Sequence, residues 1–333
     1  MKINDLSNLG TAYLHRLQVN FLNPEAPRKI PARIQIETSS KCNLRCLTCP
    51  NSRENDSGKF LTVNELQSIL NRLTFAVEHV TLSGIGEPLL NPDFFSSVDL
   101  LAERQITCEF YTNGTLLTPQ NCEAILKRHN IVSLAISCDG AEKETYESSR
   151  VGANFERWIQ SVLHLTMKKK ELRPDLNISM FTVINKQNLN ELGNIIRLAA
   201  EMGFNGVHFL DPIPVDDFAE ANVPSNIELS AINLHELFNL ARSRGLGVSG
   251  WIRRDRVPPL AIVRCLQPWE YIFIRANGNI QPCCAIFGAE KAAVMGNIFR
   301  EEFSDIWNGD RFNEFRRTSV KGTNSLCVVC PYY

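Results

Sequence analysis

The sequence predicts an α/β protein, an open, partial (β/α)6 TIM-like barrel with a small C-terminal domain. Short segments rich in Val, Ile, Phe and Thr alternate with longer amphipathic segments, which is typical of parallel strands connected by helices. Polar motifs follow the short segments, as catalytic loops follow the strands of such barrels. Near the C-terminus the alternation gives way to turns and cysteines. These three observations predict a catalytic barrel followed by a cysteine-rich domain.

The expected elements follow this order along the chain. Residues 1–30 form a helical lead-in, 31–251 the barrel and 252–333 the C-terminal domain. Strands are expected at Ala32–Glu37, His79–Ser83, Thr107–Thr112, Ile131–Ser137, Asn177–Val183 and Gly206–Leu210. Helices are expected at Val63–Leu73, Asp93–Glu103, Pro119–Lys127, Phe155–Lys168, Leu189–Met202 and Ile227–Arg244.

Each expected barrel strand is followed by a polar motif. The C-terminal ends of parallel barrel strands share one mouth, where catalytic groups gather. Six motifs in register therefore predict an active site rather than ordinary loops. The motifs are Cys42–Cys49, Gly84–Pro88, Thr112–Gly114, Ser137–Gly140, Asn185–Asn188 and Asp211–Pro212.

The composition is that of an ordinary globular protein. Hydrophobic residues make up 44% and charged residues 21% of 333 residues, and the formal net charge is −1. We therefore expect no nucleic-acid partner and no membrane partner. The N-terminus lacks the apolar core of a secretion signal, so a cytoplasmic location is expected. In such a chain, grouped cysteines are more often metal ligands than disulfides.

The first cysteine group has the spacing CxxxCxxC, in the segment CNLRCLTCP. It consists of Cys42, Cys46 and Cys49. Three thiolates can hold three irons of a four-iron cluster and leave the fourth iron open to a ligand. Zinc is the alternative, but a tetrahedral zinc site would need a fourth ligand that is not evident nearby.

The second cysteine group surrounds an expected hairpin. The Asn277–Gly278 dipeptide favours a two-residue turn, so Tyr271–Arg275 is expected to pair with the strand at Ile280. Four thiolates can close a second four-iron cluster, although a zinc ribbon would also use four. The four are Cys265, Cys283, Cys327 and Cys330.

Cys284 is left over beside Cys283. It is interpreted as an alternative cluster ligand, a buried thiol, or a catalytic hydrogen donor to a substrate radical. Free cysteine is most often a small buried apolar residue, which favours the second interpretation, and the other two stay open.

The CxxxCxxC motif after the first strand, with Gly-Glu-Pro after the second, resembles the radical S-adenosylmethionine (SAM) superfamily over residues 32–211. The C-terminal cysteines resemble the shortened form of a SPASM domain that is called a twitch domain. The resemblance implies three cofactors: SAM, a SAM-binding [4Fe-4S] cluster and an auxiliary [4Fe-4S] cluster. It also implies one-electron cleavage of SAM to methionine and a 5′-deoxyadenosyl radical, which takes a hydrogen atom from the substrate.

The resemblance also implies roles for particular residues. Gly86 and Glu87 match a segment that holds the methionyl amine, although Ile85 stands where the family more often has glycine. A second departure is Thr48, which replaces the usual aromatic residue before the third cysteine. Ser137 and Arg150 match residues that bind the SAM carboxylate, while Asn113, Asp139 and Asn188 are weaker matches for contacts to SAM or substrate.

By domain architecture the chain resembles enzymes like 2-deoxy-scyllo-inosamine dehydrogenase. This implies a small polar substrate, oxidation of a secondary alcohol in a sugar or aminocyclitol, and flavodoxin or ferredoxin as electron donor. An epimerase, with Cys284 as hydrogen donor, and a decarboxylase are alternatives. Modification of a ribosomal peptide is another, although the 31 residues before the first strand are too few for a peptide-recognition domain. The non-enzymatic alternative is an iron–sulfur or zinc binding protein.

Overall fold

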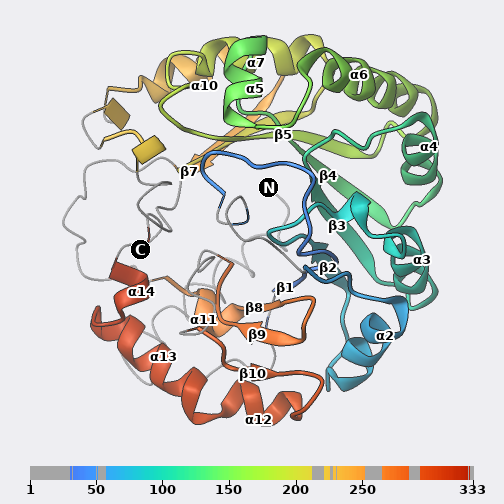
Figure 1. Cartoon of the computed structure of the whole chain (residues 1–333), viewed down its shortest axis with the longest axis vertical. Coiled ribbons are helices and arrows are strands. Elements are labelled where there is room, and N and C mark those ends of the chain that lie inside the picture. Colours follow the sequence, from blue (N-terminus) through green and yellow to red (C-terminus); the bar gives the residue numbers. More distant parts are fainter. Residues whose placement is uncertain are drawn as a thin grey trace, which may run out of the picture.

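The computed structural model describes residues 31, 33–49, 51, 58–211, 221–225, 228, 229, 231–251, 265–284, 293–328 and 330. Its strands form one sheet in the order β10-β9-β8-β1-β2-β3-β4-β5-β6-β7. The sheet curves into an open barrel, and the helices lie around its outside (Figure 1). The expected helical lead-in at 1–30 lies outside the described residues, and so do residues 252–264, where the C-terminal domain was expected to begin.

Seven neighbouring strands of the barrel run parallel, as the sequence predicts for six of them. The seventh, β7 (Gly247–Trp251), was not predicted, because its sequence GVSGW contains two glycines and resembles a loop. The first six are β1 (Arg33–Ile36), β2 (His79–Leu82), β3 (Thr107–Thr112), β4 (Ile131–Ser137), β5 (Asn177–Val183) and β6 (Gly206–Leu210). The bounds of β3 to β6 are those expected from the sequence.

Several helices of the barrel begin at a residue whose side chain caps the helix. Thr62 and Glu65 form a capping box at the start of α2, and Asn154 accepts a hydrogen bond from the Arg157 N–H at the start of α6. Such caps satisfy N–H groups that have no partner within the helix. The described helices of the barrel are α2 (Val63–Arg72), η3 (Pro88–Leu90), α3 (Phe94–Glu103), α4 (Pro119–Lys127), α5 (Lys143–Ser149), α6 (Phe155–Leu172), α7 (Leu192–Glu201) and α10 (Leu234–Ser243).

The sequence predicted a helix over Ile227–Arg244, and the start of that prediction was wrong. Asn233 caps α10 by accepting a hydrogen bond from the Glu236 N–H, so that helix begins at Leu234. The polar helix α5 was not predicted, because its sequence KETYESS lacks an apolar stripe.

Strand residues alternate between the helices and the barrel interior. Phe110 is fully buried on the helix side of β3, while its neighbour Tyr111 is partly exposed on the interior side. The same alternation places Met180 against the helices and Phe181 on the interior side of β5. The apolar core therefore lies between the sheet and its helices.

The C-terminal segment continues the barrel sheet instead of forming a sheet of its own. β8 (Tyr271–Ile274) pairs parallel with β1, and its hairpin partner β9 (Asn279–Gln281) pairs with it antiparallel. The expected hairpin turn is confirmed, with Gly278 at a φ of 85°, a conformation that favours glycine. The remaining elements are α11 (Gln267–Glu270), β10 (Gly296–Asn297), α12 (Phe303–Asn308), α13 (Asp310–Lys321) and α14 (Ser325–Val328).

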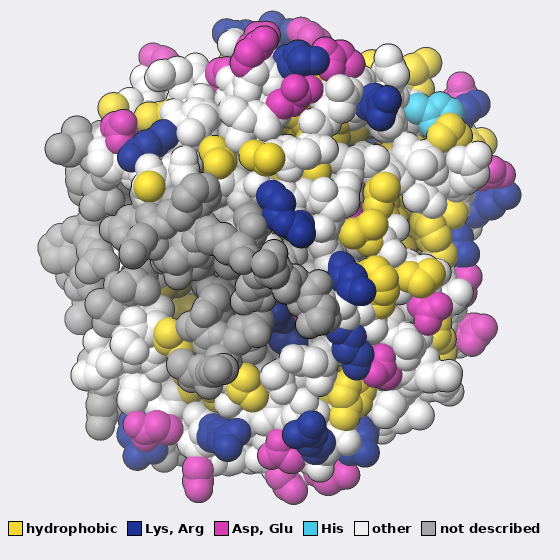
Figure 2. Space-filling view, viewed as in Figure 1, with side chains coloured by type: hydrophobic (Ala, Val, Ile, Leu, Met, Phe, Trp, Pro, Cys, Tyr) yellow, Lys and Arg dark blue, Asp and Glu magenta, His cyan; other side chains and the backbone are white. Residues whose placement is uncertain are grey.

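Two surface properties bear on partners. Within the described residues, no helix is long and apolar enough to cross a membrane. On the face that Figure 2 shows, acidic and basic side chains are interspersed around the edge, in agreement with the formal net charge of −1.

Candidate active site

The loop that carries the first cysteine group is held against the end of α5. The Arg45 N–H donates to the Val151 carbonyl at 2.9 Å, and the Leu47 N–H donates to the Ser149 carbonyl at 3.1 Å. Burial raises the pKa of the Cys42 thiol and raises the pKa of Cys46 to about 12. Such thiols become thiolate ligands when bound iron supplies positive charge. Three thiols on one loop are the kind of donor set that an iron–sulfur cluster takes, whereas the described residues contain no group of three side chains arranged to hold a single metal ion.

Glu87 is a buried carboxylate at the end of the next strand. It accepts hydrogen bonds from the Thr112 hydroxyl at 2.7 Å and from the Asn113 N–H at 2.7 Å. A third bond comes from the Leu89 N–H at 3.1 Å. Burial raises its pKa, and these hydrogen bonds act in the opposite direction. The side chain is thus fixed between the ends of β2 and β3.

Gly86 is required for packing between two loops. A Cβ at this position would collide with the backbone carbonyl oxygens of Ser39 and Lys41. The next residue, Glu87, donates its N–H to the Lys41 carbonyl at 2.8 Å. The loop Gly84–Pro88, called the glycine loop below, therefore lies directly on the chain that leads into Cys42.

Arg150 and Asp139 form a buried ion pair at 2.8 Å. Asp139 also accepts the Val183 N–H at 2.8 Å, and burial raises its pKa against the opposing effect of Arg150. The positive charge of Arg150 acts on Cys46 and lowers the pKa of that thiol. The buried Nε of Arg150 makes no hydrogen bond within the described part of the chain. An unsatisfied buried donor costs about 1–3 kcal/mol, so it fits an anionic ligand group beside the cysteine loop.

The other matched residues take different positions. Ser137 ends β4 and stands in register with Phe181 of β5. Asn113 donates to the Asn43 side chain at 2.9 Å and lies 3.8 Å from the Cys42 sulfur. Asn188 is fully buried and donates to the carbonyl oxygens of Asp139 at 3.1 Å and Val183 at 2.9 Å. These contacts make Asn188 a residue that shapes the loop after β5, and its contact with SAM or substrate stays a prediction.

The second cysteine group comes together from distant parts of the chain. Burial, with smaller contributions from the thiols of Cys330 and Cys327, raises the pKa of Cys265 to about 11. The Cys330 N–H donates to the Cys327 carbonyl at 3.0 Å. The Ser319 hydroxyl lies 3.4 Å from the Cys327 sulfur. Partly buried thiols from separate parts of the chain form a donor set of the kind that a second iron–sulfur cluster takes.

Cys284 lies close enough to interact electrostatically with Cys265 of this group and with Tyr111 on the interior side of β3. A hydrogen bond with Cys283, and a weaker contribution from Tyr271, lower its pKa to about 7 against the effect of burial. The charge of Cys284 also acts on Tyr111 of β3. Its position fits each of the three readings derived from the sequence, and the assignment of Cys284 as a catalytic hydrogen donor stays a prediction.

A row of rings lines the barrel interior and was not predicted. The ring centroids of Tyr111 and Phe181 are 4.8 Å apart, and those of Phe181 and His208 are 4.7 Å apart. His208 Nδ1 also forms a hydrogen bond with the Ser249 hydroxyl of β7. Burial lowers the pKa of His208. The two-residue alternation of strands could have placed these rings on the interior face, but their contact depends on the curvature of the sheet.

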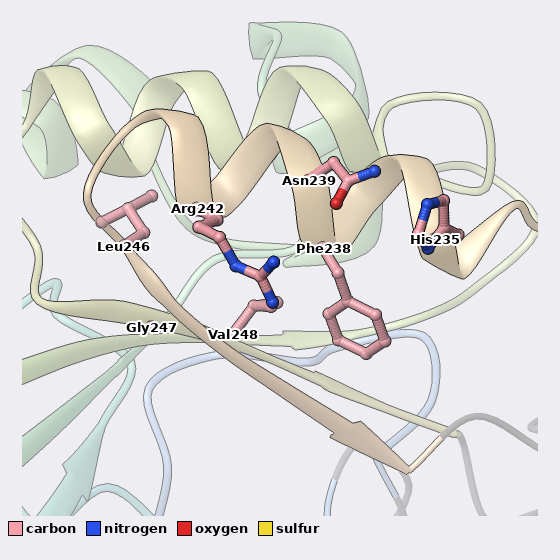
Figure 3. A pocket seen from close by; sticks show the side chains of 7 residues that line it. All are labelled: His235, Phe238, Asn239, Arg242, Leu246, Gly247 and Val248. Atoms are coloured by element: carbon pink, nitrogen blue, oxygen red, sulfur yellow. The ribbon is translucent and has the colours of Figure 1, made fainter.

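A separate cavity of 390 Å³ lies between α10 and the chain entering β7. Figure 3 shows Phe238 and Arg242 projecting from α10 toward this strand. None of its lining residues belongs to a motif identified in the sequence. They are His235, Phe238, Asn239, Arg242, Leu246, Gly247 and Val248.

Comparisons with known proteins agree with this geometry. Residues 36–199 match the radical SAM superfamily, and residues 265–331 match SPASM, an iron–sulfur cluster-binding domain. The AdoMet-dependent heme synthase of Methanosarcina barkeri is 26% identical over 327 residues, covering 91% of this chain and 89% of that protein. The mycofactocin maturase MftC of Mycolicibacterium smegmatis is 29% identical over 321 residues, covering 91% of this chain and 76% of that protein.

Among solved structures, Streptococcus suis SuiB bound to its precursor peptide SuiA superposes with a TM-score of 0.70 at 17% identity, covering 97% of this chain and 75% of that one. This likeness concerns the fold, and it is the matches over residues 36–199 and 265–331 by which the chain belongs to the radical SAM superfamily. The C-terminal part of the chain is a SPASM-type domain. The cofactors are SAM, the [4Fe-4S] cluster that binds SAM, and the auxiliary iron–sulfur clusters of the SPASM domain. This agrees with the fold and cofactors expected from the sequence.

Proposed function

We propose that this chain is an oxidising radical SAM enzyme with SAM bound at the mouth of the barrel. The observation that carries the proposal is the placement of buried Glu87 and buried Arg150 around the loop of Cys42, Cys46 and Cys49. When bound, the cluster of these cysteines and SAM supply a radical that removes a hydrogen atom from the substrate.

The two buried charges match the amino-acid end of SAM. The Glu87 carboxylate suits the methionyl ammonium, and the unsatisfied Nε–H of Arg150 suits the methionyl carboxylate. Charge-assisted hydrogen bonds of this kind are stronger than neutral ones. Because Glu87 and Arg150 are already oriented by protein contacts, SAM would bind without reorganising them.

The auxiliary cysteines support an overall oxidation. Removing a hydrogen atom takes one electron from the substrate, so a two-electron oxidation needs a second acceptor. Cys265, Cys283, Cys327 and Cys330 would hold such an acceptor, and Cys284 interacts electrostatically both with Cys265 of this group and with Tyr111 of the barrel interior. Flavodoxin or ferredoxin as donor, and a cytoplasmic location, remain predictions.

For the substrate, we propose a molecule with a planar conjugated or aromatic group. The ring row of Tyr111, Phe181 and His208 offers a largely apolar wall in the barrel interior, and aromatic pairs gain about 0.5–1.5 kcal/mol beyond area burial. One relative is named as an AdoMet-dependent heme synthase, which agrees with a planar conjugated group, and another is named as a PqqA peptide cyclase. They do not support oxidation of a sugar or aminocyclitol alcohol, which stays an alternative.

The proposed function is tested on protein reconstituted without oxygen. We expect about eight irons per chain, from two four-iron clusters, and 5′-deoxyadenosine from SAM under reductant. The variant Cys42→Ala/Cys46→Ala/Cys49→Ala should retain about four irons and form no deoxyadenosine. Cys122→Ala, at a buried cysteine outside both groups, is the matched control and should behave like wild type. Undiminished SAM cleavage by the triple variant would overturn the proposal.

The substrate class is tested by deoxyadenosine formation with different candidates. A porphyrin carboxylate and a tyrosine-containing peptide should be compared with an aminocyclitol. We expect stimulation by one of the first two, and its loss in Tyr111→Ala and Phe181→Ala. Stimulation by the aminocyclitol alone would instead support the alcohol dehydrogenase alternative.

A further inference from the structure

We propose that Glu37 is a positioning residue that couples SAM affinity to the C-terminal domain. Its carboxylate joins the glycine loop to the β8–β9 hairpin. The inference rests on the proposed function in one respect only, namely that the glycine loop contacts SAM.

The Glu37 carboxylate is divided between these two partners. Its Oε1 accepts the Ile85 N–H of the glycine loop at 3.0 Å. Its Oε2 accepts the Arg275 Nε–H at 2.8 Å and the Ala276 N–H at 3.1 Å, both from the hairpin. Glu37 is 1% exposed, so these bonds are made away from water. A buried carboxylate is retained only when such partners satisfy it.

The glycine loop is shaped to fit this carboxylate. A Cβ on Gly84 would collide with the Cβ, Cγ and Oε1 of Glu37. On its other side the loop contacts Ser39 and Lys41 through Gly86. The loop is therefore clamped between Glu37 and the chain that leads into the first cysteine group, and its first glycine is explained by Glu37 rather than by a ligand.

The hairpin side of the link is equally direct. The Glu37 N–H donates to the Ile274 carbonyl at 2.9 Å, which continues the pairing of β1 with β8. The hairpin leads from β9 into Cys283 of the second cysteine group within two residues. A change in the position of the hairpin thus reaches the glycine loop through one side chain.

Substituting Glu37 should have different effects depending on whether the residue only stabilises the fold, as a structural staple, or also couples the two sites. A staple lowers the temperature of unfolding when it is removed, but it leaves the affinity for SAM unchanged once the protein is folded and loaded with iron. A coupling residue changes the dissociation constant for SAM in folded, iron-loaded protein.

The experiment compares Glu37→Gln with wild type, both reconstituted with iron and sulfide. Glutamine keeps an oxygen that can accept the Ile85 N–H but loses the charge that faces Arg275. Equilibrium binding of SAM, and the change in the electron paramagnetic resonance spectrum on adding SAM, are the readouts. We expect the dissociation constant to rise roughly tenfold, within the usual range of coupling between sites, at unchanged iron content.

Further variants keep the test decisive. Arg275→Met should weaken SAM binding to a similar extent, and the double variant should show less than the sum of the two effects. If Glu37→Gln does not fold, Arg275→Lys retains the positive charge while disturbing the geometry, and it should weaken SAM binding more mildly. Asp175→Asn removes the partner of Arg173 in an ion pair on another part of the barrel and should leave SAM binding unchanged.

The outcomes separate this inference from the proposed function. Failure of wild type to bind SAM would remove the proposed function. Normal SAM binding by Glu37→Gln and Arg275→Met, with lower unfolding temperatures, would overturn the coupling role alone and leave the proposed function standing.

Discussion

The guanidinium of Arg150 lies 2.8 Å from the carboxylate of Asp139, and both side chains are almost fully buried. Asp139 follows β4 and Arg150 directly follows α5, so the pair connects the end of a strand to the helix that supports the first cysteine loop. The pair therefore orients a positive charge toward the site proposed for SAM.

Asp139→Asn should destabilise the protein and weaken SAM binding together. Asparagine keeps an oxygen for the Val183 N–H but leaves the buried Arg150 charge without its partner. Breaking a buried pair in this way costs about 3–5 kcal/mol, measurable by urea unfolding. Glu123→Gln, which removes one partner of an exposed pair on α4, is the control and should leave the free energy of unfolding almost unchanged, because water screens exposed pairs. An equally small effect of Asp139→Asn would contradict the role of the pair.

Gly86→Ala should reduce the iron content of the first cluster. The added Cβ meets the backbone carbonyl oxygens of Ser39 and Lys41, so the chain leading into Cys42 must shift. Iron per chain and the unfolding temperature are the measurements. In Gly193→Ala, on α7, the added Cβ meets only ordinary contacts, and helix propensity predicts a gain of up to about 1 kcal/mol. Full iron loading of Gly86→Ala would show that the loops can separate without loss of the site.

Ser319→Ala should shift the reduction potential of the auxiliary cluster to a lower value. The Ser319 hydroxyl lies 2.7 Å from the Phe315 carbonyl oxygen and 3.4 Å from the Cys327 sulfur. Burial raises the pKa of that thiol, and its hydrogen bond with Ser319 lowers it. When the hydroxyl donates to the sulfur of a bound cluster it stabilises the reduced state. A redox titration followed by electron paramagnetic resonance measures the change. Ser304→Ala, on α12 and away from the cysteines, should leave the potential as it is. A potential unmoved by Ser319→Ala would place that hydroxyl outside the cluster's hydrogen-bond environment.

His208 should make the protein less stable as the pH falls. Burial lowers the pKa of its imidazole in the folded state, while the nearby Glu109 carboxylate acts in the opposite direction. The unfolded chain therefore binds the proton at a higher pH than the folded protein does. As a result, the free energy of unfolding falls as the pH drops from the ordinary histidine pKa through the folded-state pKa. His208→Asn should lose less stability than wild type between about pH 8 and pH 5, as measured by urea unfolding. Identical pH profiles would contradict this.

Local patterns predicted much of the barrel. The bounds of β3 to β6 followed from runs of β-branched and aromatic residues between turn signals, and the motifs at the strand ends indicated the loops that carry the candidate site. The pairing of β8 with β1 could not be predicted, since it joins segments more than 230 residues apart. Likewise, nothing in the local sequence around Glu37 indicates a role, because its partners lie 48 to 239 residues away.

The parallel pairing of β8 with β1 has a consequence for engineering the protein. A chain truncated after β7 would expose the backbone N–H and C=O groups of β1 as a new sheet edge, and exposed edges invite aggregation. It would also leave the buried Glu37 carboxylate without Arg275. A chimera that exchanges the C-terminal domain between related enzymes should therefore take β8 and the hairpin arginine along with the cysteines, and place the junction before α11.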